Sequence, residues 1–211
     1  MKYVKRVGFA AAAVALLVAL AGSGTASGTV LCKTPGTGSP TGTTCPEGWA
    51  YGPGTRIHAV AEGTVTITTE YVTVHCNEAT IEIETTNEGS ATETVKGPQG
   101  SLIYGGCNCE VKVLKSGTVE IHAIAGTHNG TLTGSNNEVT TTCSTIFGKV
   151  HCIYVTEATD LGTITGGSTA TLDLDVDLLP APTNFLCSSS DTLEGSLEIT
   201  DPKPLYIASH T

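Results

Sequence analysis

Cysteine is the residue type that offers the clearest chemistry in this chain of 211 residues. Eight cysteines are an even set, and in an exported chain such a set forms a disulfide framework. The alternative is a zinc site built from a Cys-x-Cys pair and histidines. We expect disulfides, because His75 and His151 each precede a cysteine on a predicted strand and therefore point to the opposite face. The cysteines are Cys32, Cys45, Cys76, Cys107, Cys109, Cys143, Cys152 and Cys187.

Sequence spacing narrows the pairing of these cysteines without fixing it. The first two flank a loop rich in Gly, Thr and Pro, which buries little surface and needs a covalent clasp. Cys143 and Cys152 flank a plausible hairpin turn, so we expect a bridge between adjacent strands. A bridge within the Cys-Asn-Cys triplet at 107–109 would close a strained ring. The predicted bridges are Cys32–Cys45, Cys143–Cys152, Cys76–Cys107 and Cys109–Cys187.

Carboxylates on the predicted strands could supply the acid and base of a glycoside hydrolase, which needs two carboxyl groups within about 5 to 10 Å. Strand residues two apart lie about 7 Å apart, so alternation alone produces such pairs. We therefore favour a solvated strand face. No nucleophile-elbow or zinc-protease motif accompanies the histidines, so no catalytic residue and no cofactor is predicted. The carboxylates considered are Glu82, Glu84, Glu120, Asp173, Asp175 and Asp177.

Two further groups of residues could bind a ligand. The row Asp173, Asp175 and Asp177 offers oxygens of the kind that calcium prefers, although three carboxylates along a straight strand cannot all converge on one ion. Trp49 and Tyr51 lie in a loop-like segment and share one face, so they could stack on a sugar ring. The competing interpretation is that Trp49 plugs one end of the fold.

The elements that must position these residues are strands. Leu172, Leu174, Val176 and Leu178 alternate with the three aspartates, which is the pattern of a strand with one wet face. Four further strands are expected to start with a Gly-Thr-aliphatic step, in which Gly takes the positive φ of the turn. We predict an all-β fold: an antiparallel β-sandwich, Greek-key or jelly-roll-like, stapled by disulfides.

The N-terminus predicts export. Lys2, Lys5 and Arg6 precede an uncharged apolar run, and small residues at 24–26 suit signal peptidase. We expect a signal peptide at 1–26, a disulfide-clasped loop segment at 27–55 and a sandwich domain at 56–211. No later apolar run is long enough to span a membrane. The mature chain, without three basic residues, would carry a net charge of 7 − 20 = −13, against −10 for the whole sequence, which disfavours nucleic acid as a partner.

The chain also shows a resemblance. The segment Thr29-Val30-Leu31-Cys32-Lys33, the paired central cysteines and the ending Ile199–Tyr206 resemble uncharacterised exported, cysteine-paired β-rich proteins of high-GC Gram-positive bacteria. The similarity spans nearly the whole mature chain, and it implies no activity and no functional residues.

These observations favour a secreted, non-enzymatic protein with a surface, matrix or ligand-binding role, and a cell-surface glycan or protein is the partner class considered. The first alternative is a small secreted hydrolase that acts on glycans through a carboxylate pair. The second is a protease inhibitor, for which the loops at 33–44 and 144–151 would be the contact segments.

Overall fold

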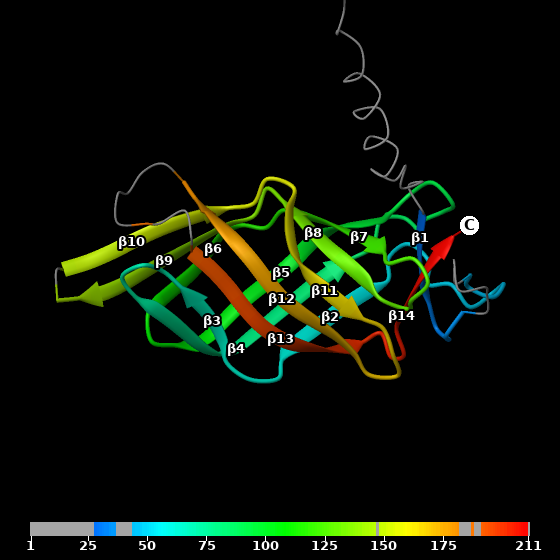
Figure 1. Cartoon of the computed structure of the whole chain (residues 1–211), viewed down its shortest axis with the longest axis horizontal. Helices are drawn as coiled ribbons and strands as arrows, with labels where there is room; N and C mark the ends of the chain where they lie inside the picture. The colour runs from blue at the N-terminus through cyan, green and yellow to red at the C-terminus, as the bar shows by residue number, and fades with distance from the viewer. Residues whose placement is uncertain (1–27, 37–43, 147, 182–186, 188–190, 211) are drawn as a thin grey trace, which may run out of the picture.

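The chain folds as an all-β protein in the computed structural model, which describes residues 28–36, 44–146, 148–181, 187 and 191–210 (Figure 1). The predicted signal peptide at 1–26 lies outside these residues. The described strands are β1 (Gly28–Cys32), β2 (Arg56–Ala61), β3 (Val65–Thr68), β4 (Thr73–Glu84), β5 (Val95–Cys107), β6 (Glu110–Lys115), β7 (Thr118–Ala123), β8 (Gly130–Ser135), β9 (Glu138–Thr145), β10 (Gly148–Val155), β11 (Thr159–Thr165), β12 (Ala170–Pro180), β13 (Asp191–Asp201) and β14 (Tyr206–His210).

The main sheet closes into an antiparallel barrel, so the predicted sandwich is wrong. Eight strands follow one another around it in the order β2, β4, β5, β7, β8, β11, β12 and β13. Closure comes from β13, which pairs with β12 on one edge and with β2 on the other, where Leu197 lies opposite Ala61. Each barrel strand pairs with the next barrel strand along the chain, which is an up-and-down order rather than a Greek key or jelly roll.

The alternation predicted from the sequence sets the inside and outside of this barrel. Along β12, Leu172, Leu174 and Val176 are buried, while Asp173 and Asp175 between them are exposed. The inward side chains form the main hydrophobic cluster, to which nearly every barrel strand contributes. At about 25 cal/mol per Å² of apolar surface removed from water, this cluster is the main stabilising element of the barrel.

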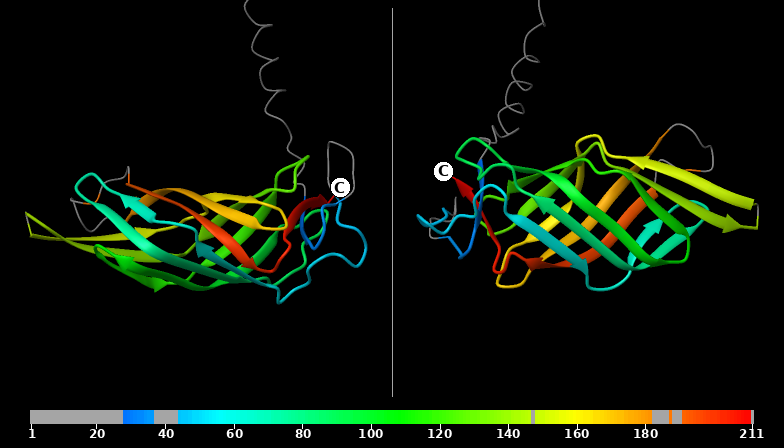
Figure 2. Two further views of the ribbon diagram at one scale, coloured as in Figure 1. Left: turned by 90° about the horizontal axis from the view of Figure 1, so that it is seen from below. Right: turned by 180° about the vertical axis from the view of Figure 1, so that it is seen from behind.

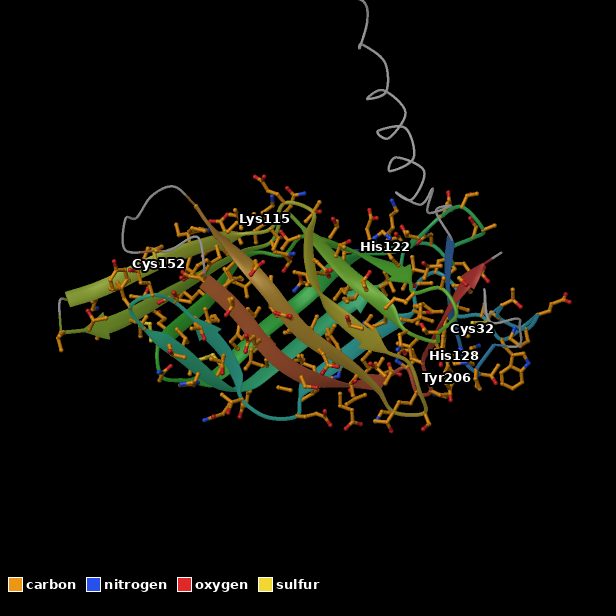
Figure 3. All side chains as sticks on the ribbon, in the orientation of Figure 1. Cys32, Lys115, His122, His128, Cys152 and Tyr206 are labelled. Carbon is orange, nitrogen blue, oxygen red and sulfur yellow. A yellow bond between two sulfur atoms is a disulfide. The ribbon has the colours of Figure 1, made fainter. Side chains whose placement is uncertain are left out.

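A two-stranded sheet closes one end of the barrel. Strand β1 is buried along its whole length and pairs with β14, so part of the segment predicted as a loop is a strand. Leu31 and Ile207 of this sheet join the main cluster. On the same side, His128 packs its ring edge-on against Tyr206, with 5.7 Å between ring centroids. Figure 3 shows Cys32, His128 and Tyr206 together at this end.

The opposite end of the barrel is extended by a second sheet. Strand β9 pairs with both β10 and β6, and β10 joins the barrel only through Tyr154 and Val155, which pair with the end of β12. Strand β5 pairs with β7 through Val95–Pro98 only, so its second half has β4 as its sole ladder partner among the described strands. Figure 2 shows β9 and β10 projecting beyond the barrel, away from β1 and β14. The barrel is therefore wider at this end, where β9 and β10 complete its wall.

Four disulfides connect these elements, and two of the predicted bridges are confirmed: Cys32–Cys45 and Cys76–Cys107. The other two predictions are wrong. In the β9–β10 ladder, Cys143 lies opposite Val150 rather than opposite Cys152. Each of these two cysteines therefore bonds to a different part of the chain. The observed bridges are Cys109–Cys143, with 4.8 Å between Cα atoms, and Cys152–Cys187, with 5.7 Å.

Candidate ligand-binding cavity

A cavity of about 70 Å³ lies where the widened end of the barrel meets the β9–β10 hairpin. Its walls come from β3, β4, β5, β11, β12 and β13 on the barrel side and from the base of β9 and β10 on the other. It exists because β5 leaves β7 after Pro98, so the barrel wall is completed here by a sheet that joins β12 through two residue pairs. Elsewhere in the barrel, buried side chains pack into the main hydrophobic cluster.

The walls of this cavity are almost wholly apolar. Ile67 and Ile81 reach it from β3 and β4, Leu102 from β5, and Leu174 and Val176 from β12. These residues occupy the inward positions of strands whose alternate positions face water. Closed eight-stranded barrels have interiors just wide enough to be filled by side chains or to hold one small ligand. In this barrel one part of the interior is packed with side chains and another part contains the cavity.

Asn137, one of the polar residues in the lining, is fully engaged in holding the two sheets together. Its Oδ1 accepts a hydrogen bond of 2.7 Å from the backbone N–H of Gly117, and its Nδ2 donates one of 3.1 Å to Oγ1 of Thr156. A Cβ at Gly117 would lie 1.9 Å from the carbonyl oxygen of Ser135, so only glycine fits there. Asn137 therefore fixes the base of the β9–β10 hairpin against the turn before β7.

Tyr154 contributes its ring to the lining and uses its hydroxyl elsewhere. The hydroxyl donates a buried hydrogen bond of 2.8 Å to Oδ2 of Asp191. Loss of hydration raises the pKa of Tyr154 above its ordinary value, and the Asp191 carboxylate raises it further. The Asp191 carboxylate therefore lies behind the cavity wall, and the Tyr154 ring separates it from the cavity.

Gln99 and Tyr104 differ from the other polar residues of the lining, Asn137, Tyr154 and Thr156, in the state of their side-chain hydrogen bonds. Gln99 is 6% exposed, and its side-chain amide has no hydrogen-bond partner among the described residues. The Tyr104 hydroxyl likewise has none within the described part of the chain, and burial raises the pKa of Tyr104. Neither side chain is among the fully buried polar atoms that lack a partner in the described part of the chain, so both keep contact with accessible space. The Gln99 amide and the Tyr104 hydroxyl are therefore available to form hydrogen bonds with a ligand in the cavity.

The aromatic pair predicted to bind a ligand lies at the other end of the molecule. Trp49 is 52% exposed beside the β1–β14 sheet. The Tyr51 hydroxyl donates a 2.7 Å hydrogen bond to the carbonyl oxygen of Pro204, and the Lys33 ammonium lies 5.2 Å from the Tyr51 ring centroid. The Tyr51 hydroxyl is thus hydrogen-bonded at the end of the barrel that the β1–β14 sheet closes. Trp49 lies on the surface there, remote from the cavity.

The predicted carboxylates line the outside of the barrel. Asp173 accepts a 2.7 Å hydrogen bond from Ser196 on the neighbouring strand, and Asp175 and Asp177 continue the same exposed face. Across the residues the structure describes, no three His, Cys, Asp or Glu side chains gather closely enough to hold a metal ion. Glu82 accepts a 3.0 Å hydrogen bond from Ser101, and Glu120 pairs with a lysine. None of these carboxylates is among the residues that line the cavity.

The segments considered for protease inhibition are described in part. Residues 37–43 of the first loop lie outside the described residues. The second forms the β9–β10 hairpin, where Ile146 is 94% exposed at the tip and disulfides from Cys143 and Cys152 hold the two strands. This segment projects away from the cavity.

Neither Gln99 nor Tyr104 was predicted as a cavity residue from the sequence, although the position of Gln99 carried a signal. Val95, Gly97 and Gln99 share the inward parity of β5, whereas Lys96, Pro98 and Gly100 face out. A long polar side chain at an inward-facing strand position indicates either a hydrogen-bonded core residue or a ligand-binding residue. Tyr104 lies beyond an irregularity between Ile81 and Ile83 in the β4–β5 register, so its direction could not be read from parity.

Comparison of the chain with protein-family models, with curated proteins and with solved structures gave no significant match. The part of the chain that the structure describes includes no helix with the length and apolar character needed to cross a membrane.

Proposed function

We propose that this protein is a secreted, non-enzymatic binding protein that takes a small apolar ligand into the cavity at the widened end of its barrel. The observation that carries this proposal is an apolar cavity whose lining includes two polar side chains, Gln99 and Tyr104, without a hydrogen-bond partner among the described residues. Side-chain packing would normally eliminate such a space, because unfilled volume and unpaired polar groups both lower stability. Four disulfides, which are typical of an oxidising, extracellular-type environment, support the expected export.

A binding role fits the cavity better than catalysis. The lining contains no carboxylate, imidazole, amine or thiol to act as nucleophile or general base. The carboxylates considered for glycan hydrolysis face solvent on the barrel exterior, and every described cysteine is in a disulfide. The groups present can orient a ligand and exclude water from it, which is what a binding site requires.

The size of the cavity limits the ligand. An engineered apolar cavity of about 150 Å³ in another protein holds benzene, so about half that volume suits a short alkyl group. The best small ligands gain about 1.5 kcal/mol per non-hydrogen atom, so a five-atom probe would bind no more tightly than a few micromolar. The test must therefore detect weak binding.

Titration of the oxidised protein with 1-chlorobutane, followed by NMR of its isoleucine methyl groups, tests the proposal. We expect the methyl resonances of Ile67 and Ile81 to shift in a saturable way, because both residues line the cavity. Those of Ile121 and Ile164, which belong to the filled part of the barrel, should not move.

Two matched variants locate the binding. Val139→Phe places a phenyl ring into the cavity lining and should abolish the shifts, whereas Val60→Phe adds the same ring to the outer face of β2 and should leave them unchanged. Uniform small shifts in all four isoleucines, or saturable shifts that persist in Val139→Phe, would contradict the proposal.

A further inference from the structure

The side chain of Gln99 faces the cavity from a buried position in its wall. Residues 95 to 100 of β5 alternate strictly between buried and exposed, and Gln99 is on the buried side with Val95 and Gly97. Its backbone N–H is satisfied by the carbonyl oxygen of Gly117, at 3.0 Å. Its side-chain amide, by contrast, has no hydrogen bond to any described residue. One donor group and one acceptor are therefore held ready in an apolar space.

The cavity offers this hydrogen-bonding capacity without charge. No lysine, arginine, histidine, aspartate or glutamate is among its lining residues. The nearest ionisable group established by contact is Asp191, whose Oδ2 accepts the hydrogen bond of Tyr154 behind the wall. An anionic ligand would find no cation among the lining residues, and an ammonium ion would find no anion there, so either would lose hydration without a compensating charge in the wall. Both charged classes are disfavoured.

On the basis of the proposed function, we propose that the cavity selects a neutral amphiphile: a short alkyl chain that carries a hydroxyl, carbonyl or amide group. The alkyl chain packs against the aliphatic wall, and the polar group hydrogen-bonds to the side-chain amide of Gln99. The amide both donates and accepts, so it recognises all three groups. Binding then provides the partner that the folded protein alone leaves missing.

Tyr104 is a separate contact. The ladder places Gln99 opposite Ile83 and Tyr104 opposite Ala79. These positions are about 13 Å apart along β4, so the two side chains enter the cavity from different places on β5. Gln99 is the more deeply buried of the two, and we assign it the selective contact.

Four probes of the same chain length test this assignment: 1-butanol, 1-chlorobutane, butyrate and butylammonium, each titrated at neutral pH with the isoleucine methyl readout. We expect 1-butanol to bind at least about tenfold more tightly than either ion, since neither charge has a partner in the wall. Gln99→Met, which keeps the side-chain length, should weaken 1-butanol relative to 1-chlorobutane by about tenfold, the effect of one lost hydrogen bond. Tyr104→Phe should leave that ratio unchanged.

The outcomes separate this inference from the proposed function. If 1-chlorobutane binds in the cavity but the ratio is the same in Gln99→Met as in the native protein, the neutral-amphiphile assignment is wrong while the binding role stands. Binding of butyrate or butylammonium as tight as that of 1-butanol, or loss of the ratio in Tyr104→Phe instead, would also overturn it. If none of the four probes shifts Ile67 or Ile81, the proposed function fails, and this inference fails with it.

Discussion

Replacement of Gln99 by methionine should make the protein more stable, although it removes a polar group from a native cavity. Gln99 is 6% exposed and its amide has no hydrogen-bond partner among the described residues, although the amide atoms are not fully shielded from solvent. Methionine has a similar length and no polar group that requires a partner. Because the amide is not fully desolvated, we expect the free energy of unfolding to rise by up to about 1 kcal/mol, which for a domain of this size is about 2 to 4 °C in Tm.

A matched variant on the same cavity should show the opposite sign. Asn137→Leu also replaces a buried amide by an apolar side chain, but this amide accepts from Gly117 and donates to Thr156. Its loss leaves the Gly117 N–H buried without an acceptor, so we expect destabilisation by about 2 to 4 kcal/mol. Guanidinium unfolding of the oxidised proteins, followed by far-UV circular dichroism, measures both changes. Destabilisation of Gln99→Met by 1 kcal/mol or more would refute the reasoning, because it would mean that the amide makes a bond in the folded protein.

Two further predictions concern the bridges and the tyrosines. Replacement of both Cys109 and Cys143 by serine removes their bridge and should lower the free energy of unfolding by about 2 to 4 kcal/mol. Peptide mapping of the native protein without reduction should recover the Cys109–Cys143 bridge. Recovery of a bridge between Cys143 and Cys152 would contradict the structure. Tyr104 and Tyr154 have pKa values raised above the ordinary 10.0, so below about pH 10 both are neutral in the folded and unfolded chain alike. Above that pH the unfolded chain ionises first and stability should fall, less steeply in Tyr104→Phe; equal slopes in unfolding curves from pH 9 to 11 would contradict the burial of that hydroxyl.

The strands could be predicted from the sequence because every second side chain faces water and is polar, while those between face the core and are apolar. In β12 the outward positions are aspartates and the inward ones are Leu or Val, so the strand and its faces follow from composition alone. The closed barrel could not be predicted in this way. Its closure depends on β13 meeting β2, and a sandwich strand would carry the same alternation.

The disulfide bridges likewise could be predicted where they depend on local sequence and could not where they depend on strand register. Cys32–Cys45 closes a short loop and could be predicted from spacing. The error at Cys143 and Cys152 arose because the hairpin register sets which residues face each other, and the turn residues alone did not fix that register. The cavity could not be predicted for a related reason, since its walls come from five barrel strands, β3 and a second sheet.

The most direct test of the binding cavity is a crystal structure of the oxidised protein under xenon pressure, because xenon occupies apolar cavities that exclude water. We expect a xenon atom in contact with Ile81, Leu174 and Val176, at the junction of the barrel and the β9–β10 hairpin. A space filled instead by ordered waters that hydrogen-bond to Gln99 would contradict the account, because the site would then be a hydrated structural void.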